Sequence, residues 1–265
     1  MTDAFLQRIG LATRPEATVD GLFDLHRAYL ARVPYEDIAV QLGETGPLDE
    51  AALAARVCAD GRGGYCFELN AVLAALLRWC GFDVTRHQAV VGGEGPTNHM
   101  ALLVHLDGER WLADAGLGEG FAEPLRFRQG TTEIGPFTYT LTREGRGSWW
   151  MGQHEWSSIS GFRMTEKEST LADFDVHHHR LAHDPESSFV KTLVVQSARP
   201  ERVVTLRART LSAIGPGVDD KRVIDRDEFG PVLLGEFGIA LDGERLERLW
   251  GLAAAQHEAF TAARV

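Results

Sequence analysis

The chain has 265 residues, of which 44% are hydrophobic and 25% are charged, a balance typical of a soluble globular protein with ample material for a core. Its 27 basic and 38 acidic residues give a formal net charge of −11, and the scattered basic residues exclude an obvious nucleic-acid surface. No run of about eighteen uncharged apolar residues exists to span a membrane, and the N-terminus lacks the pattern of a signal peptide. We therefore expect a cytoplasmic protein with neither a nucleic-acid nor a membrane partner.

Three helices are predicted in the first third of the chain. Apolar residues recur at helical spacing over residues 18–33. A second helix fits residues 49–57, and Gly61 is placed to end it. The third begins at Cys66, its apolar residues follow an i, i+3, i+4, i+7 pattern, and Gly81 stands just after it. This part of the chain is expected to form a helical bundle.

Beyond the third helix the apolar period changes to two. Short β-rich runs, separated by Gly, Pro and Asp turns, cover residues 83–91, 99–106, 110–115, 137–142, 190–195 and 202–210. Residues 241–255 return to helical spacing, with Leu246, Leu249, Trp250 and Ala253 on one face. Helices, then antiparallel strands, then a mixed end predict an α+β fold.

The chain has three cysteines, Cys58, Cys66 and Cys80, an odd number that favours reduced thiols over a disulfide framework. No CxxC pair indicates zinc, and we expect no metal site. Cys80 continues the apolar stripe of the third helix, and no motif surrounds Cys58. Both are interpreted as structural.

Cys66 stands apart because it follows "GRGGY" at the first turn of a helix. Unpaired backbone N–H groups and the helix dipole favour an anion there and lower the pKa of a thiol. The glycines allow the backbone to pack closely before the helix. Arg62 is near enough in sequence to stabilise this loop or to add to the positive electrostatic field at Cys66. A buried cysteine also serves as a small hydrophobic residue, so the local sequence leaves both interpretations open.

The segment "HMALLVHLDGERWLADAG" predicts a hairpin whose two-residue turn is Asp107-Gly108. This turn sets Leu106 opposite Glu109, Val104 opposite Trp111, and Ala101 opposite Asp114. His99 shares the face of Ala101, so His99 and Asp114 become diagonal neighbours within side-chain reach. We expect the Nδ1–H of His99 to donate to Asp114, as in a base and its orienting carboxylate. The alternative is an ordinary strand-start histidine and a turn-forming aspartate.

The ordered motifs "RGGYCFELN", "HMALLV" and "WLADAGLG" resemble those of the arylamine N-acetyltransferases, and "VPYEDI" and "DFDVHHHRLAHDPESSF" extend the similarity. The resemblance implies Cys66 as nucleophile, His99 as base and Asp114 as the residue that orients it. It implies a helical bundle over residues 1–82, an antiparallel β-barrel over 83–188 and an α/β lid over 189–265, with a cysteine-protease-like catalytic core.

The resemblance further implies ping-pong transfer of an acetyl group from acetyl-CoA, through an acetyl-cysteine, to an arylamine, arylhydrazine or arylhydroxylamine. The alternatives are an amide synthase that acts on a polyketide-type acyl thioester, a thiol hydrolase or transglutaminase-like enzyme with the same residue order, and a non-catalytic binding module.

Further roles are implied for residues around the three motifs. Glu36 resembles a partner for Arg62, either in a structural ion pair or with a direct catalytic role. The residues similar to those that line the family's acceptor pocket are Tyr35, Phe67, Val91 and Phe189. The segment "VVGGEGPTNH", which contains Gly92 and Thr97, is a candidate for binding coenzyme phosphates through backbone N–H groups.

Two departures from the family pattern bear on the acceptor. Leu117 replaces a phenylalanine that often follows Asp-x-Gly, which changes the pocket wall. His178, His179 and Arg180 stand where the family commonly has Asn and two aromatic residues. We expect these residues on a strand, with alternating faces that leave His177 and His179 on one side and complete no metal site. If the segment borders the cavity entrance, its basic side chains favour an acidic or otherwise unusual acceptor.

Overall fold

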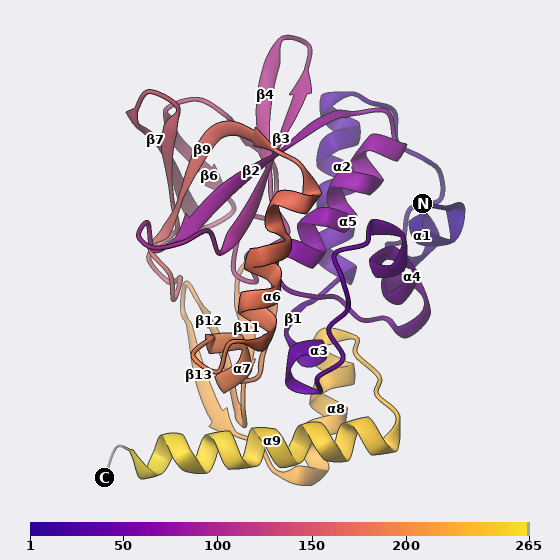
Figure 1. Cartoon of the computed structure of the whole chain (residues 1–265), viewed down its shortest axis with the longest axis vertical. Helices are drawn as coiled ribbons and strands as arrows, with labels where there is room; N and C mark the ends of the chain where they lie inside the picture. The colour runs from indigo at the N-terminus through magenta and orange to yellow at the C-terminus, as the bar shows by residue number, and fades with distance from the viewer. Residues whose placement is uncertain (264–265) are drawn as a thin grey trace.

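Residues 1–263 are described in a computed structural model of the chain (Figure 1). The helices of the first third are α1 (Asp3–Arg8), α2 (Val19–Arg32), α3 (Ile38–Gln41), α4 (Glu50–Asp60) and α5 (Cys66–Trp79). The three predicted helices are confirmed as α2, α4 and α5. Thr18 caps α2 by accepting a hydrogen bond from Gly21, and Gly61 ends α4 in the left-handed conformation with φ +64°.

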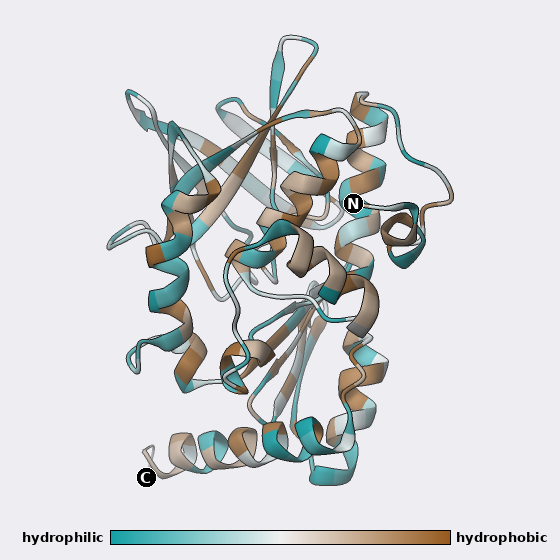
Figure 2. Ribbon diagram, turned by 45° about the vertical axis from the view of Figure 1, so that its right-hand side comes forward, coloured by the Kyte–Doolittle hydropathy of each residue, from teal (hydrophilic) through white to brown (hydrophobic). Residues whose placement is uncertain are grey.

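Helix α5 lies at the centre of the molecule. Most of its residues are buried, because it packs against α2 and α4 on one side and against β2 and β3 of the barrel on the other. Figure 2 shows its hydrophobic residues in brown where it passes between these layers. A helix enclosed in this way gives its first residue, Cys66, a fixed position.

Eight antiparallel strands form a nearly closed barrel in the order β5-β4-β3-β2-β9-β8-β7-β6. Their bounds are β2 (Asp83–Val91), β3 (His99–Leu106), β4 (Glu109–Ala113), β5 (Leu125–Arg126), β6 (Gly130–Ile134), β7 (Phe137–Gly145), β8 (Ser148–Gly152) and β9 (Gly161–Ser169). The β3–β4 register is the one expected, with Leu106 opposite Glu109 and Val104 opposite Trp111. Asp107 and Gly108 have φ values of +51° and +77°, as a type I′ turn requires.

A second sheet has the order β1-β10-β11-β12-β13. Its strands are β1 (Tyr35–Glu36), β10 (Val194–Ala198), β11 (Val203–Arg207), β12 (Thr210–Gly215) and β13 (Val218–Val223). One face is apolar and packs through Val195, Val204 and Leu206 against α8 (Arg226–Phe237) and α9 (Gly243–Ala262). The opposite face of the sheet is directed away from these two helices. Strand β1 pairs with β10 and so joins the N-terminal part of the chain to this sheet.

The C-terminal helix is confirmed as α9, which buries Leu249 and Ala253 and crosses the end of the molecule in Figure 1. Other expectations are wrong. The histidine segment is not a strand but helix α6 (Asp175–His183), which follows the short 3₁₀ helix η1 (Leu171–Phe174). The strand expected over residues 190–195 starts only at Val194, and the residues before it form helix α7 (Ser188–Lys191). A short apolar run does not by itself distinguish a helix from a strand, so the sequence did not show where one ends and the other begins.

The strand expected over residues 202–210 is also divided. Ala208 has φ +49°, which turns the chain back between β11 and β12. In residues 1–263 no helix combines the length and the apolar character needed to cross a membrane.

Candidate active site

Cys66 is the first residue of α5 and is only 3% exposed. Glu68 accepts a hydrogen bond from the backbone N–H of Tyr65 at 3.3 Å, which closes the first turn. A side chain at Gly63 would overlap the carbonyl of Pro34, and one at Gly64 would overlap Glu68. The two glycines are therefore required by close packing ahead of the cysteine.

The loop before Cys66 is anchored by a buried ion pair. Arg62 donates from Nε and Nη2 to the two carboxylate oxygens of Glu36 at 2.9 and 3.0 Å, and the N–H of Ile38 donates to the same carboxylate at 2.7 Å. Burial raises the pKa of Glu36, but the charge and hydrogen bonds of Arg62 outweigh it, so the net pKa is lowered. Neither residue lines the cavity described below, so their effect on Cys66 is one of position.

His99 and Asp114 are in contact, and both are buried. The His99 Nε2 lies 2.6 Å from Asp114 Oδ2. The expected nitrogen was wrong: Nε2 donates, whereas the buried Nδ1 has no hydrogen-bond partner within residues 1–263. Donation from Nε2 makes Nδ1 the unprotonated nitrogen that accepts a proton.

Asp114 is fixed by further hydrogen bonds to its Oδ1. Asn70 Nδ2 donates to it at 2.8 Å, and the N–H of Gly116 donates at 2.7 Å. Asn70 also accepts from the N–H of Ala115 at 2.8 Å, so one α5 side chain holds the backbone and the carboxylate together. With His99 on Oδ2, the carboxylate has three donors and a single orientation.

His26, on α2, holds the same segment from the opposite side. Its Nε2 accepts from the backbone N–H of Asp114 at 3.2 Å, and its Nδ1–H donates to the carbonyl of Ala122 at 3.2 Å. Burial lowers the pKa of His26, which keeps the ring neutral and able to accept. The sequence reasoning missed both His26 and Asn70. The available signal was a polar residue on the apolar face of each helix.

The Cys66 thiol donates to the carbonyl of Asn98 at 3.2 Å. Burial raises its pKa well above the usual value, the charge of Asp114 adds to this, and the backbone N–H of Phe67 opposes it. The helix start was expected to lower the pKa of this thiol, but the effect of burial is larger and the net pKa is raised. Ionisation needs a proton acceptor, and His99, whose Nδ1 has no hydrogen-bond partner among the described residues, lines the same cavity.

Cys66 and His99 line one cavity of about 240 Å³. Four of the expected pocket residues line it as well, namely Tyr35, Val91, Leu117 and Phe189. Phe67, which was also expected there, does not line it and is fully buried against Phe174. Gly92 and Thr97, expected to bind coenzyme phosphates, lie outside this cavity; Gly92 is in the turn after β2, and Thr97 donates to Gln88 at 3.0 Å. We refer to this space as the inner cavity.

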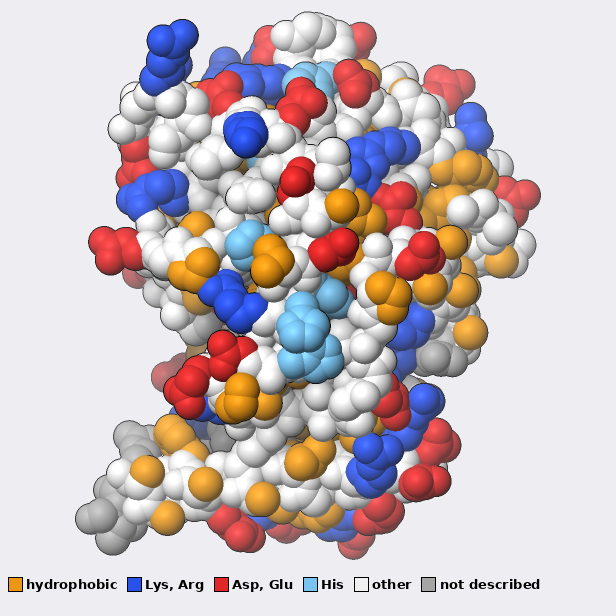
Figure 3. Space-filling model, viewed as in Figure 1, with side chains coloured by type: hydrophobic (Ala, Val, Ile, Leu, Met, Phe, Trp, Pro, Cys, Tyr) orange, Lys and Arg blue, Asp and Glu red, His pale blue; other side chains and the backbone are white. Residues whose placement is uncertain are grey.

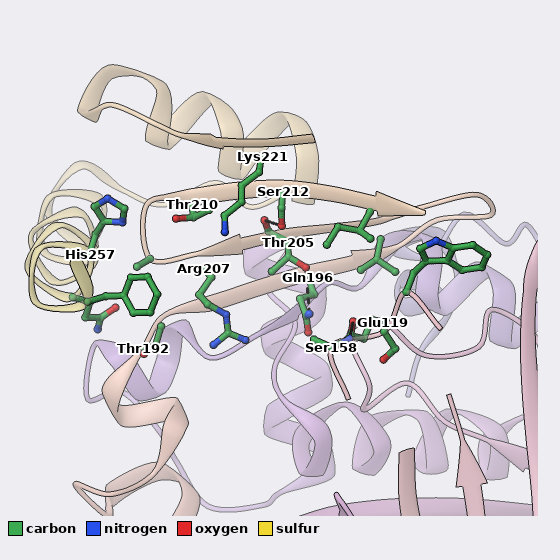
Figure 4. A pocket seen from close by; sticks show the side chains of 17 residues that line it. Glu119, Ser158, Thr192, Gln196, Thr205, Arg207, Thr210, Ser212, Lys221 and His257 are labelled. Atoms are coloured by element: carbon green, nitrogen blue, oxygen red, sulfur yellow. Dashed lines mark hydrogen bonds between the residues drawn. The ribbon is translucent and has the colours of Figure 1, made fainter. Parts of the chain in front are cut away.

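A larger recess of about 630 Å³ adjoins the inner cavity and is shown in Figure 4. The two share four lining residues, Glu119, Ser158, Gln196 and Arg207. The outer wall comes from the second sheet and from the end of α9, including His257. We call this space the outer cavity. A long substrate can extend from it to the sulfur of Cys66.

The histidines of α6 gather on the surface shown in pale blue in Figure 3, but they do not reach the inner cavity. His178 accepts a hydrogen bond from the Tyr65 hydroxyl at 2.5 Å and donates to the carbonyl of Gly46 at 2.8 Å. Arg180 donates to the carbonyl of Thr97 at 2.8 Å. These residues stabilise the fold beside the cysteine loop and supply no wall of the inner cavity; His178, His179 and His183 line a separate hollow instead. No set of three His, Cys, Asp or Glu side chains suited to a metal occurs in the described part of the chain.

Comparison with known proteins adds independent evidence. A family model described as N-acetyltransferase matches residues 18–246. The arylamine N-acetyltransferase / N-hydroxyarylamine O-acetyltransferase of Salmonella typhimurium is 30% identical, with 90% of this chain and 89% of that protein covered. The proansamycin X synthase of Amycolatopsis mediterranei is 28% identical, with 89% and 98% covered.

Solved structures agree with these relatives. The Nocardia farcinica arylamine N-acetyltransferase superposes with a TM-score of 0.85 at 29% identity, covering 94% of this chain and 92% of its own. The Mycobacterium abscessus enzyme gives a TM-score of 0.87 at 27% identity, covering 95% and 94%.

Proposed function

This chain belongs to the arylamine N-acetyltransferase family, and from that premise we propose that it moves an acetyl group from acetyl-CoA to the nitrogen of an arylamine, arylhydrazine or arylhydroxylamine. Membership of the family makes it an acyltransferase. The observation that supports the assignment of residues is the 2.6 Å contact between His99 Nε2 and Asp114, which leaves Nδ1 to accept a proton, together with the cavity that both His99 and Cys66 line.

In the first half-reaction, His99 Nδ1 takes the proton of Cys66, and the sulfur attacks the thioester carbonyl. A carbon–sulfur bond forms to Cys66, the bond to coenzyme A breaks, and the imidazolium returns its proton to the departing thiolate. Asp114 keeps the ring aligned and stabilises its positive charge. The N–H of Phe67, which lowers the pKa of the thiol, stabilises negative charge on the sulfur.

In the second half-reaction, the amine nitrogen attacks the acetyl carbonyl on Cys66. His99 accepts the amine proton, the carbon–nitrogen bond forms, and the bond to the cysteine sulfur breaks. His99 then reprotonates the sulfur, which restores the resting enzyme. Coenzyme A leaves before the amine binds, so both substrates use the same cavity in turn and the kinetics are ping-pong.

The shape of the recess supports a long thioester donor. The inner cavity holds the reacting sulfur, and the outer cavity adjoins it along four shared residues. The reactive end of acetyl-CoA fits the inner space, while the rest of the molecule extends into the outer one. The chemistry needs no metal ion, because Cys66, His99 and Asp114 supply the nucleophile and the proton transfers.

Intact-protein mass spectrometry after mixing with acetyl-CoA tests this assignment. We expect one acetyl adduct on the wild type, none on Cys66→Ala, and an adduct on Cys58→Ala, which removes a thiol outside the cavity. Addition of an aniline should discharge the adduct. An adduct that persists on Cys66→Ala would exclude this cysteine as the nucleophile, and its absence from the wild type would exclude acetyl-CoA as donor.

A second candidate is an amide synthase that takes a larger acyl thioester. The similarity to a proansamycin X synthase and the larger volume of the outer cavity favour it. Competition between acetyl-CoA and a bulky acyl thioester for Cys66 separates the two functions. Release of free acetate without any amine would instead support a thiol hydrolase.

A further inference from the structure

The recess beside Cys66 differs in charge from the protein around it. The chain carries a net charge of −11, yet the lining of the two cavities includes two cations, Arg207 and Lys221, against one carboxylate, Glu119. That carboxylate is buried and accepts hydrogen bonds from the backbone N–H of Ser158 at 2.9 Å and from its hydroxyl. Its hydrogen-bonding capacity is used within the protein.

Arg207 is different because its guanidinium has no hydrogen-bond or ion-pair partner within residues 1–263. Arg180 and Arg163, which line neither cavity, do have such partners. Arg207 stands at the end of β11, where its side chain is exposed. The charge of Arg207 acts on the buried Tyr35 and Asp37, whose pKa values burial raises and Arg207 lowers, but its N–H groups donate to no described residue and remain available to an anion.

The register of the second sheet explains where Arg207 points. It pairs with Val194 on β10 and Thr210 on β12, and therefore shares a face with Gln196 and Thr205. This is the face opposite the apolar one that packs on α8 and α9, and Figure 4 shows its polar side chains around the outer cavity. Arg207 lies at the junction, since it lines both cavities, whereas Lys221 lines only the outer one.

We propose that Arg207 binds a carboxylate on the acceptor, so that the protein prefers arylamines that carry an acidic group. This inference rests on the proposed function. A single aromatic ring in the inner cavity lies between Tyr35, Leu117 and Phe189, with its amine toward Cys66 and its carboxylate toward Arg207. A guanidinium matches a carboxylate with two parallel hydrogen bonds, which fixes the orientation of the ring as well as its charge.

The donor's phosphates are the competing partner for Arg207, because Arg207 lines the outer cavity as well as the inner one. In acetyl-CoA the pantetheine arm separates the phosphates from the thioester, so they lie in the outer space when the carbonyl is at Cys66. Lys221 faces that outer space without reaching the inner one. It therefore provides a control with the same charge at a different distance from the reaction.

The test compares kcat/KM for 4-aminobenzoate with kcat/KM for aniline. For Arg207→Gln we expect the ratio of the two values to fall about tenfold, because a charge-assisted bond to the carboxylate is lost. Arg207→Lys should keep part of the preference, and Lys221→Gln should leave the ratio unchanged. Raising the salt concentration should lower the wild-type ratio, because salt screens a partly exposed ion pair.

An unchanged ratio in Arg207→Gln overturns the proposal, and so does a variant that only slows acetylation of Cys66 by acetyl-CoA. The latter result would assign Arg207 to the donor. The acetyl adduct on Cys66 separates this failure from a failure of the proposed function. If the adduct forms and aniline is acetylated while the ratio stays constant, only the role of Arg207 is wrong.

Discussion

The two regions that meet at the cavities are built in opposite ways. On the side of α5 and the barrel, Cys66, His99 and Asp114 are at most 3% exposed, and the hydrogen bonds around them come from the protein. On the side of the second sheet, Thr205 and Ser212 are partly exposed and Lys221 is exposed. The first region fixes the groups that we propose to react, and the second leaves polar groups available to a ligand.

The hydrogen bonds of two charged residues illustrate this difference. Asp114 accepts from Asn70, Gly116 and His99, so moving it would break several buried contacts. Arg207 donates to no described residue, and a ligand can bind it without displacing a protein partner. The hydrogen bonds of Asp114 therefore hold the proposed catalytic groups in a fixed geometry. The unpaired N–H groups of Arg207 are available, in our proposal, to select the substrate. Three substitutions, in order of expected effect, test this contrast.

The largest effect is expected for Asp114→Asn. Its amide would present N–H groups to His99 Nε2, which forces the ring proton onto Nδ1, the nitrogen that must accept the proton of Cys66. We expect kcat/KM to fall about 10³- to 10⁴-fold, as for loss of the orienting carboxylate in a triad. Steady-state acetylation of an aniline measures this loss. Ser212→Ala, on the polar face of the second sheet, is the comparison and should stay within about twofold. Equal effects of the two changes would contradict the contrast.

The second effect concerns stability, through Glu36→Gln. Removing one partner of the buried pair leaves Arg62 uncompensated, and we expect the free energy of unfolding to fall by about 3–5 kcal/mol at pH 7. The folded-state pKa of Glu36 is lowered, so its contribution is present above the unfolded value of about 4.3 and is lost as pH falls through the folded pKa.

Urea unfolding of the wild type and of Glu36→Gln between pH 7 and pH 4 checks this sign. The difference in unfolding free energy should be largest at neutral pH and should shrink at the acid end. Glu109→Gln, which breaks an exposed pair with Arg126, is the matched control and should have a much smaller effect. A pH-independent difference for Glu36→Gln would show that its charge is not the cause.

The smallest of the three effects is expected for Gly116→Ala. The added Cβ would lie 2.8 Å from Cys66 Cα, 2.9 Å from Cys66 Cβ and 2.8 Å from Asn70 Nδ2, so the cysteine or its support must shift. We expect kcat/KM to fall about 10²-fold, the scale of a misplacement of about 1 Å. Gly251→Ala on α9, where a Cβ meets nothing within 4 Å, should leave activity unchanged. Wild-type activity in Gly116→Ala would mean that the cysteine tolerates displacement.

Much of the catalytic side could be predicted from the sequence because its signals are local. The apolar spacing of α5 fixes where the helix begins, and so puts Cys66 at its first turn. The Asp-Gly turn sets the register of β3 and β4, which brings His99 and Asp114 to one face. The choice of Nε2 over Nδ1 was not predictable, since it depends on the angle at which the ring meets the carboxylate.

The histidine segment shows where local reasoning failed. Consecutive polar residues carry no apolar period, so residues 177–180 gave no basis for choosing helix over strand. The structure makes them part of α6, buries His178 against Tyr65 and turns Arg180 toward Thr97. An anion-binding role expected from their charge is instead proposed for Arg207, which the sequence did not single out.

By itself, the sequence determined the α+β class, the helices and hairpin that carry the cysteine, histidine and aspartate, and the family resemblance of their motifs. Only the tertiary structure decided which distant residues surround them: Asn70 and His26 on the carboxylate, and Arg207 at the junction of the cavities. The physical reason is that periodicity and turn chemistry act over a few residues. The neighbours of a side chain are set by packing between segments far apart in the chain.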